Sequence, residues 1–491
     1  MMCPNTVENP QYITDYLVRN AQQWPDKPAI IFGEQVLTWG ELLIVVSRGA
    51  EYLSRRLPRD EQAIVAILLP NSPDFVITYL SVLHAGHIAM PMDSGFKAME
   101  VRAVAGHMLP ELVVTDSEHQ EMLGDHPIVL ANELQISDDT ILGAFFLRLS
   151  PDTQIASTLF TSGTTGRPKS VPSTHMSYLW NAMTASEVWQ WTHEDTLLVS
   201  LPLSHWHGLV MAMGGMLIHG NTCYLQAKFS SAATLELLES GSISVFMHVP
   251  SAYADLVMHN PNKTYDLSRV RLFISGSSFL PPKIWQQFKE RFGHEIVERY
   301  AASEMGLVAT NTLTDRRPGS VGYPPKGVEV KIMPDGEVAV RSPGVFRGYW
   351  HADDATKQQL TPDGYWRSGD LGQLDDSGRL CLKGRLQERL IKSGYVVSPR
   401  DIEWALMQHS AVREAVVMGV HREDKVNDLF VYFVTGDITK LEIIAYARKV
   451  MPLYWRPDKI ILLPAIPKTG QTRKLALKEL RAIIDREMPN W

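Results

Sequence analysis

Short apolar runs alternate with helical patterns over much of the chain. Residues 63–70 (AIVAILLP) predict a buried strand, residues 74–86 have the spacing of a helix that ends at a glycine, and residues 87–93 (HIAMPMD) predict the next strand. Similar short apolar runs, typical of buried strands, occur at residues 244–250 and 271–277. Strand, helix and strand in close succession indicate a βαβ unit, and hence a mostly parallel sheet covered by helices.

The last part of the chain predicts a separate unit. Residues 384–400 (GRLQERLIKSGYVVSPR) are dense in charge after a glycine-rich stretch, and the residues after them have their own alternation of helix and strand. At 491 residues the chain is also far longer than one small domain. We therefore expect an α/β protein with a large N-terminal domain of βαβ-type sheets flanked by helices, residues 1–386, and a small, mobile α+β lid domain, residues 387–491.

Composition excludes several classes of partner. The net charge is −7 and no run of five basic residues occurs, which argues against nucleic acid or an acidic membrane. The three cysteines are scattered without a CxxC pair, so we expect neither a disulfide framework nor a zinc site, and a cytoplasmic location is favoured. No signal peptide is expected. The longest apolar run, residues 208–218, is too short to span a bilayer and predicts a buried core segment.

A stretch rich in glycine and hydroxyl groups, residues 159–170 (LFTSGTTGRPKS), predicts a phosphate site. Backbone N–H groups of such a loop bind phosphate oxygens, with hydroxyls and a lysine ammonium as further donors. The donors expected here are Thr161, Ser162, Gly163, Thr164, Thr165, Gly166 and Lys169. The G-x-x-x-x-G-K-[ST] loop of nucleotide hydrolases does not fit, because the two glycines stand too close together. By itself, the stretch is equally consistent with a flexible surface turn.

This stretch resembles the phosphate loop of the acyl-adenylate-forming enzymes, the superfamily of acyl- and aryl-CoA synthetases, peptide-synthetase adenylation domains and beetle luciferases. Further segments resemble the other motifs of that superfamily, in the same order and over nearly the whole chain. They are PLSHWHG (202–208), ERYAASE (298–304), RPGSVGYP (317–324), GVFRGYW (344–350), GYWRSGDLGQLDDSGRLCLKGR (364–385), SPRDIE (398–403) and PKTGQTRK (467–474). Within the superfamily, the chain looks nearest to malonyl-CoA-synthetase-like and other short-chain acid ligases.

The resemblance implies a reaction in two steps. A small carboxylic acid is activated with ATP to acyl-AMP and pyrophosphate, and the acyl group is then transferred to the thiol of CoA. The first step brings two anions together, so it needs charge screening and alignment. The resemblance implies that the loop holds the departing phosphates, that Glu304 holds Mg²⁺ against them, and that the Ser303 hydroxyl donates to the α-phosphate. It also implies that Tyr300 stacks on adenine, that Asp370 accepts both ribose hydroxyls, and that Arg385 supports the ribose and orients the lid.

The acid pocket implied by the resemblance consists of His205, Trp206, His207, Ser275, Gly276 and Ala301. Ala301 replaces a glycine where the backbone approaches the substrate, and its methyl group would shorten the pocket. Trp206 adds bulk, so both residues favour a small or flat acid. An α-amino acid is not expected, because adenylation domains for amino acids have an Asp where this chain has Ser204 and His205. Asp255 stands where malonate ligases are expected to have a carboxylate-binding arginine; a free carboxylate there would repel a second carboxylate and make malonate doubtful.

The final loop departs from the superfamily pattern Pro-Lys-x-x-x-Gly-Lys. Counting forward from Pro467 gives Arg473 as the catalytic cation, whereas counting backward from the apolar residues Leu475 and Leu480 gives Lys474. A one-residue insertion would keep the apolar register of the following helix, so we expect Lys474. The distinction matters because a guanidinium is a planar fork and no simple replacement for an ammonium.

Three classes of function stay open. The first is an AMP-forming acid–thiol ligase that acts on free CoA. The second is a stand-alone enzyme that loads the phosphopantetheine arm of an acyl carrier protein. The third is a non-catalytic adenylate-binding homologue, because Gln387 and Ser393 replace other residues of the superfamily around the hinge and the final loop is altered. Pyrophosphate exchange with a panel of acids separates the third class from the other two.

Overall fold

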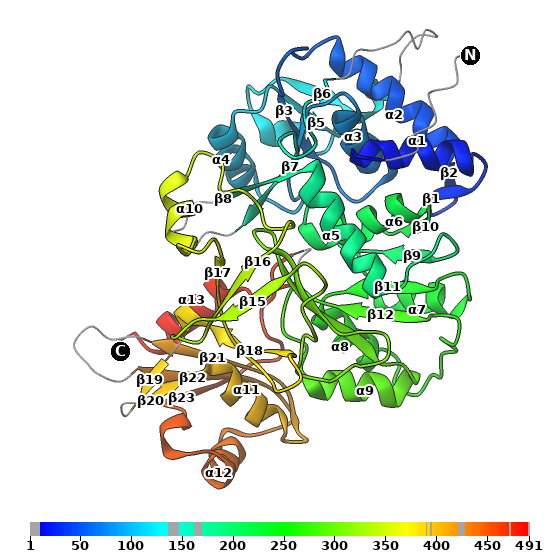
Figure 1. Ribbon diagram of the computed structural model, residues 1–491. Helices are drawn as coiled ribbons and strands as arrows, with labels where there is room; N and C mark the ends of the chain where they lie inside the picture. Colours follow the sequence, from blue (N-terminus) through cyan, green and yellow to red (C-terminus); the bar gives the residue numbers. More distant parts are fainter. Residues whose placement is uncertain are drawn as a thin grey trace.

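The computed structural model describes residues 10–135, 147–161, 169–388, 390–392, 395–420, 428–470 and 473–489. Its larger part is an α/β body with two large sheets and a smaller antiparallel one, and the C-terminal residues form a unit with a sheet of its own (Figure 1). This confirms the predicted fold class of a large N-terminal body followed by a smaller C-terminal domain.

The first sheet contains the βαβ unit predicted from the sequence. In sheet order its strands are β6 (Ile128–Leu130), β5 (Leu112–Thr115), β3 (Ile64–Leu68), β4 (Ile88–Pro91), β7 (Ile155–Thr161) and β8 (Lys169–Thr174). β3 and β4 are parallel neighbours joined by α3 (Pro73–His84). The helix begins where the Ser72 side chain accepts the Phe75 N–H, and it ends before Gly86, whose φ of +91° and contact with the Leu147 carbonyl leave no room for a Cβ atom.

The second sheet is parallel except for an antiparallel strand at each edge. Its strands, in order, are β14 (Gly306–Thr310), β13 (Ile296–Ala302), β12 (Leu272–Ser275), β11 (Val245–His248), β9 (Thr196–Val199), β10 (Thr222–Leu225), β1 (Pro28–Phe32) and β2 (Gln35–Thr38). The strands predicted at 244–250 and 271–277 are β11 and β12, and they pair with each other in parallel.

The body is layered, with helices between and outside the two large sheets. One apolar cluster joins the facing sides of both sheets to the helices between them: α1 (Ile13–Gln23), α2 (Trp39–Ser54), α3, α5 (His175–Val188) and α6 (Gly214–His219). The outer face of the first sheet packs on α4 (Ala98–Met108). The outer face of the second sheet packs on α7 (Ser231–Glu239), α8 (Pro250–Met258) and α9 (Pro282–Phe292).

The apolar run at 208–218 is buried, as predicted, but it begins with a π-helical turn, His207–Met213, that continues into α6. Its glycines fit the crowded core, since a Cβ at Gly208 would lie 2.4 Å from the Pro202 carbonyl oxygen and one at Gly215 would meet the Trp191 ring. Such turns are frequent at functional sites, and this one begins at His207, a predicted acid-pocket residue, with His205 and Trp206 just before it.

The third sheet and the C-terminal unit complete the chain. The third sheet is antiparallel, with β15 (Glu329–Ile332), β16 (Glu337–Arg341), β17 (Trp366–Leu374) and β18 (Leu380–Arg385), next to α10 (Asp353–Gln359). The C-terminal unit contains the hairpin β19 (Leu390–Lys392) and β20 (Tyr395–Val397), the sheet β21 (Val412–Val420), β22 (Leu429–Gly436) and β23 (Lys459–Leu462), and helices α11 (Pro399–Met407), α12 (Lys440–Val450) and α13 (Leu477–Glu487).

The apolar clusters divide between the same two units. Among the described residues, two clusters are built from residues after 389 and the others from residues before 383. Because the apolar clusters separate in this way, we propose residue 386 as the domain boundary.

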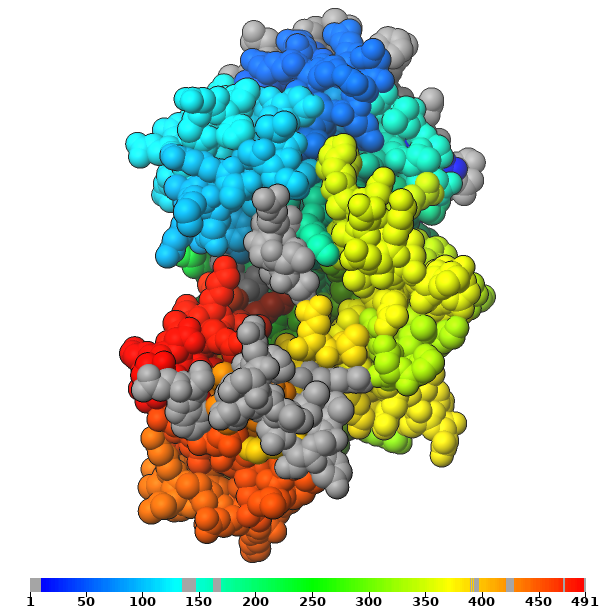
Figure 2. Space-filling model, turned by 90° about the vertical axis from the view of Figure 1, so that its left-hand side faces the viewer, coloured from blue at the N-terminus to red at the C-terminus, as the bar shows by residue number. Residues whose placement is uncertain are grey.

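Figure 2 shows the C-terminal segment, in orange and red, as a lobe below the blue and cyan part of the body, with the surface hollowed between them. Within the described ranges, no helix is long and apolar enough to cross a membrane.

Candidate active site between the body and the C-terminal domain

Three residues that the sequence assigned to a nucleotide site lie together. The register of β17 and β18 places Asp370 opposite Arg385, and Arg385 Nε lies 2.8 Å from Asp370 Oδ1. The Tyr300 hydroxyl, on β13, donates to Asp370 Oδ2 at 2.5 Å. Burial raises the pKa of Tyr300 well above its ordinary value, and the negative charge of Asp370 raises it further. Burial lowers the pKa of Arg385, but the charges of the surrounding acidic groups, Asp370 foremost, together outweigh this effect and leave the pKa raised.

Glu304 contacts the first residue of the predicted phosphate loop directly and is linked to its last residue through Tyr349. It stands in the turn between β13 and β14 and accepts hydrogen bonds from the Thr161 and Tyr349 hydroxyls, each at 3.2 Å. The Lys169 ammonium lies 4.7 Å from the centroid of the Tyr349 ring. Ser303 precedes Glu304 and is half-buried. The remaining loop residues of the prediction, Ser162, Gly163, Thr164, Thr165 and Gly166, lie outside the described residues.

The predicted acid-pocket residues come from the carboxyl ends of parallel strands and from the π-helical turn. Ser275 ends β12 directly beside His248, which ends β11. Trp206 is buried just before the turn, and Ala301, near the end of β13, is partly buried against the main core. The carboxyl ends of parallel strands are the usual place for ligand sites in α/β folds, so this edge of the second sheet and the turn above it form one candidate pocket.

His205, just before the π-helical turn, and His207, its first residue, contact different partners. His205 Nε2 lies 3.1 Å from Asp93 Oδ2, at the carboxyl end of β4, and His207 Nδ1 lies 3.1 Å from Ser277 Oγ. Burial lowers the pKa of His207 well below its ordinary value, and the cation of Arg299 lowers it further. The ring of His207 is therefore neutral at pH 7. Within the described chain, its Nε2 atom is buried without a hydrogen-bond partner.

Arg299 is a buried cation that the sequence analysis did not select. Only 3% of its surface is exposed, and its guanidinium carbon lies 5.6 Å from the centroid of the Trp206 ring. The guanidinium fills the open side of Gly276, where a Cβ would lie 2.5 Å from that carbon. In the part of the chain that the structure describes, Nε and Nη2 have no hydrogen-bond partner. Burial lowers the pKa of Arg299 to about 9, which still leaves it protonated at pH 7.

Other buried polar atoms near Arg299 share this lack of partners. Among the described residues, Ser275 Oγ and His248 Nε2 are buried and make no hydrogen bond. Buried polar groups in proteins are nearly always paired, and a buried charge is costly without a counter-charge. Open donors around a buried guanidinium therefore indicate a polar, anionic ligand at this end of the pocket.

The site residues that the sequence analysis did not select are marked by only a weak signal in the sequence. Arg299 interrupts an apolar strand (IVERYAA, 296–302), and a charge inside a buried strand is a reason to expect a ligand. Asp93 ends the strand predicted at 87–93, and His248 lies near the end of the strand predicted at 244–250. A polar residue at that position points to the carboxyl edge of the sheet.

The final loop turns the two candidate cations in different directions. Lys474 closes a small hairpin, since its carbonyl accepts the Thr469 N–H at 2.7 Å and its own N–H donates to Thr469 Oγ1 at 3.1 Å. Burial lowers the pKa of Lys474 most, the cations of Arg385 and Arg299 lower it further, and the charge of Glu304 raises it. Lys474 is an exposed residue, and these three charged groups lie on the side of the body. Lys474 is thus within electrostatic reach of both halves of the candidate site.

Arg473 points instead to helix α8 of the body. Its Nη2 forms an ion pair with Asp255 Oδ2, and its guanidinium carbon lies 5.4 Å from the centroid of the Phe229 ring. Its φ of +51° lies in the left-handed region that favours glycine. This is the conformation expected at the glycine that precedes the lysine in the superfamily pattern, and it supports the alignment with a one-residue insertion. Asp255 is therefore not the free carboxylate on which the doubt about malonate rested.

Comparison with known proteins identifies the family. The model of the AMP-binding enzyme family matches residues 17–350, and that of its C-terminal domain matches residues 401–473. The chain belongs to the AMP-binding enzyme family.

It is 30% identical over 484 residues to the mitochondrial malonate–CoA ligase of Xenopus laevis, covering 85% of this chain and 82% of the relative. It is 27% identical over 525 residues to 4-coumarate–CoA ligase 1 of Narcissus pseudonarcissus, covering 97% of this chain and 94% of the relative. The crystal structure of ATP-bound MatB from Rhodopseudomonas palustris superimposes with a TM-score of 0.88 at 25% identity, covering 96% of this chain and 99% of that one.

These matches confirm the superfamily predicted from the motifs. They also confirm the predicted similarity to malonyl-CoA-synthetase-like acid ligases within it. They further confirm the predictions of an ATP-dependent, AMP-forming acid–CoA ligase, of ATP and CoA as its substrates, and of Mg²⁺ as its metal cofactor. An enzyme is thereby favoured over the non-catalytic homologue. The roles assigned to single residues stay predictions, which the arrangement above makes testable.

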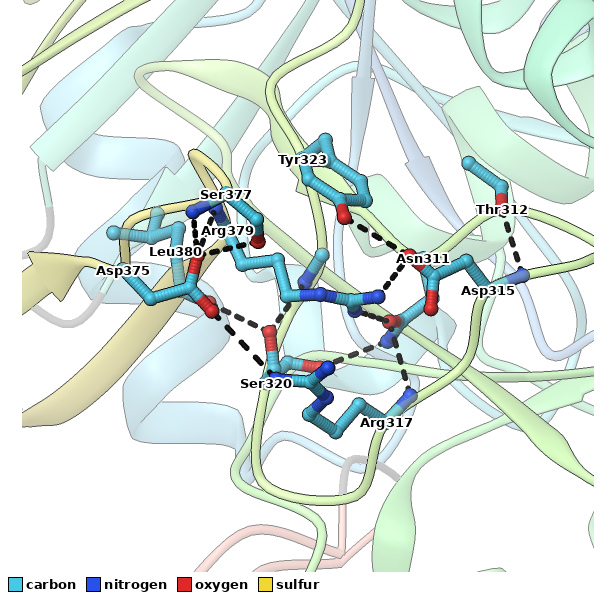
Figure 3. A network of polar contacts seen from close by, with 11 residues as sticks. Asn311, Thr312, Asp315, Arg317, Ser320, Tyr323, Asp375, Ser377, Arg379 and Leu380 are labelled. Carbon is cyan, nitrogen blue, oxygen red and sulfur yellow. Dashed lines mark hydrogen bonds and ion pairs between the residues drawn. The ribbon is translucent and has the colours of Figure 1, made fainter.

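In this AMP-binding enzyme, a polar network fixes the hairpin that carries Asp370 and Arg385 (Figure 3). Arg379, buried behind the turn between β17 and β18, pairs with Asp315 and lies 4.7 Å from the centroid of the Tyr323 ring. The Asp375 carboxylate accepts the Arg379 N–H at 3.0 Å and closes the turn. The network ties the hairpin to the segment that follows β14, so the carboxylate and guanidinium of the nucleotide site are held against the body.

Proposed function

We propose that the chain activates a small carboxylic acid that carries a second anionic group, and transfers the acyl group to CoA. The observation that supports the second anionic group is Arg299, a buried guanidinium with open donors at the end of the pocket. A desolvated cation is stabilised by a ligand anion far more than by water-exposed groups. The malonate–CoA ligases among the relatives also support an acid with a second anionic group, since malonate carries two carboxylates.

The nucleotide half of the site suits a polyanion. Arg385 pairs with the Asp370 carboxylate, the charge of Glu304 acts on Lys474, and Lys169 lies over the ring of Tyr349, whose hydroxyl donates to Glu304. In our proposal Asp370 accepts the ribose hydroxyls, Arg385 supports them, and the ring of Tyr300, fixed through its hydroxyl, packs on adenine. Glu304 has the hard oxygen donors that Mg²⁺ prefers, and Mg²⁺ would screen the phosphate charge when bound.

The chemistry then divides between two lid orientations. In the first, a carboxylate oxygen of the acid attacks the α-phosphorus of ATP, the bond to the β-phosphate oxygen breaks, and pyrophosphate leaves. Lys474 lies where it can stabilise the added negative charge on the α-phosphate. In the second, the CoA sulfur attacks the acyl carbon, AMP leaves, and the thiol proton passes to solvent. The lid motion between the two steps is implied by the family resemblance.

The size and charge of the pocket limit the acid. Trp206 and Ala301 favour a short chain, and the Asp255 charge that would repel a second carboxylate is neutralised by Arg473. CoA is proposed as the acceptor in preference to a carrier protein, because the matched relatives are CoA ligases. The cytoplasmic location stays a prediction.

Pyrophosphate exchange with matched pairs of acids tests the proposal. We expect malonate or succinate to give a kcat/KM at least tenfold above that of propionate or butyrate, which have similar chain lengths and lack the second charge. Adding CoA or a phosphopantetheinyl carrier protein, and weighing the product, identifies the acceptor. Equal rates within each pair would remove the anionic group from the proposal, and exchange with none of the acids would remove the function.

The assignment of Asp370 predicts a specific loss of nucleotide affinity. Asp370→Ala should weaken AMP binding by about 1.5–3 kcal/mol, the scale for lost hydrogen bonds to a charged group, as measured by calorimetry. Asp370→Asn keeps the shape and separates the loss of charge from a packing effect. Asp376→Ala, at an exposed position in the turn of the same hairpin, is the matched control and should bind AMP normally. Unchanged affinity in both Asp370 variants would place the ribose elsewhere.

A further inference from the structure

Arg473 and Asp255 join the final loop of the C-terminal domain to the acid-binding side of the body. Asp255 lies on α8, and Arg473 reaches it from the residue directly before Lys474. The pair is half-buried, with 29% of the Arg473 side chain and 38% of the Asp255 side chain exposed. Two further contacts hold the same residue: the Ser251 hydroxyl donates to the Arg473 carbonyl at 3.4 Å, and the guanidinium lies over Phe229.

The left-handed backbone of Arg473 separates the directions of two neighbouring side chains. Arg473 turns to Asp255 on α8, whereas the charges that act on the neighbouring Lys474 are those of Arg385, Arg299 and Glu304. The hairpin bonds between Thr469 and Lys474 keep the loop short and closed. Fixing Arg473 on the body therefore also fixes where the Lys474 ammonium lies.

We propose that the Asp255–Arg473 ion pair is a latch that positions Lys474 for acyl-adenylate formation. Both are positioning residues, and the inference rests on the proposed role of Lys474 in that step. Among the described residues, other contacts join the domains through different elements: Lys283 donates to the His409 and Val412 carbonyls, and Arg400 lies over the Phe279 ring. Those contacts hold the domain, whereas the latch sets the loop that carries the cation.

The latch has a defined consequence for the two half-reactions. Without it the loop samples more conformations, so a smaller fraction of molecules has Lys474 in place for adenylation. Formation of the thioester from pre-made acyl-AMP uses another orientation of the lid, in which this loop has left α8. Loss of the latch should therefore slow the first half-reaction and leave the second unchanged.

A double-mutant cycle with a charge swap tests this inference. Arg473→Ala and Asp255→Ala should each slow acyl-AMP formation about tenfold, and the double alanine variant should be no slower than either one. The swap Asp255→Arg with Arg473→Asp should recover the rate to within about threefold. Arg481→Ala, which removes an arginine that contacts the Gly419 carbonyl inside the C-terminal domain, is the matched control and should keep the wild-type rate.

Several outcomes would overturn the latch. They are additive losses in the double variant, no recovery in the swap, or an equal loss in both half-reactions. If the wild-type protein forms no acyl-AMP from any acid, the proposed function fails. The latch is then tested by a distance measurement that needs no turnover. A fluorescence distance between a label on α4 and a label on the final loop at Gly470, with ATP present, should lengthen or broaden in Arg473→Ala and return in the swap. An unchanged distance would refute the latch independently.

Discussion

Replacing Lys474 by alanine is expected to slow acyl-adenylate formation by about two to three orders of magnitude, the scale for a single preorganised electrostatic contact. The charge of Glu304 acts on the Lys474 ammonium, whereas the neighbouring cation, Arg473, is paired with Asp255 and is not free to take over the charge of Lys474. Thioester formation from pre-made acyl-AMP should stay nearly intact. Single-turnover release of pyrophosphate and mass analysis of the thioester measure the two steps separately.

The comparison with Arg473 decides between the two alignments of the final loop. Arg473→Ala should lose about tenfold in the first step, far less than Lys474→Ala, because it acts through the position of Lys474. Lys478→Ala, at an exposed position on α13, is the control for removal of a lid lysine. A larger loss in Arg473→Ala than in Lys474→Ala would mean that the guanidinium is the catalytic cation. Equal losses in both half-reactions of Lys474→Ala would contradict the two-orientation scheme.

Replacing Arg299 by methionine is expected to raise the KM for an acid with a second carboxylate about 100- to 1000-fold. The reason is the loss of a buried, charge-assisted contact, which is worth about 2–5 kcal/mol when one partner is truncated. Methionine fills the space over Gly276 and beside Trp206 without the charge. For the matched monocarboxylic acid, kcat/KM should change by less than about threefold, because that acid has no group for the guanidinium to bind.

Thermal unfolding provides a second measurement on the same Arg299 variant. An unpaired buried cation destabilises the free enzyme, so Arg299→Met should keep or raise the Tm when no acid is bound. Wild-type protein should gain stability on adding the dicarboxylate, and the variant should not. A lower Tm of the free variant, with parallel losses for both acids, would show that Arg299 is structural.

Much of the fold followed from local pattern. The alternation of apolar runs and helical spacing predicted β3, α3 and β4, because burial on both faces of a parallel strand and on one face of a helix leaves a periodic signal within a few residues. The glycine- and hydroxyl-rich loop, and the order of the motifs after it, predicted the superfamily and the pairing of a large body with a small C-terminal domain. Asp370, Arg385, Tyr300 and Glu304 were selected in the same way, from the segments in which they stand.

The sequence by itself determined which residues can do the chemistry, and the tertiary structure decided how they face one another. Whether Arg473 or Lys474 reaches the phosphates depends on a left-handed φ and on an ion pair with a residue 218 positions earlier, and no periodic pattern reports either. Arg299 became a candidate anion receptor only when its guanidinium was seen buried over Gly276, with Nε and Nη2 unpaired among the described residues. Asp255 likewise changed from a repelling charge to half of a neutral pair. Periodicity records which side of an element is buried, but the partner of a buried charge is set by how distant elements pack.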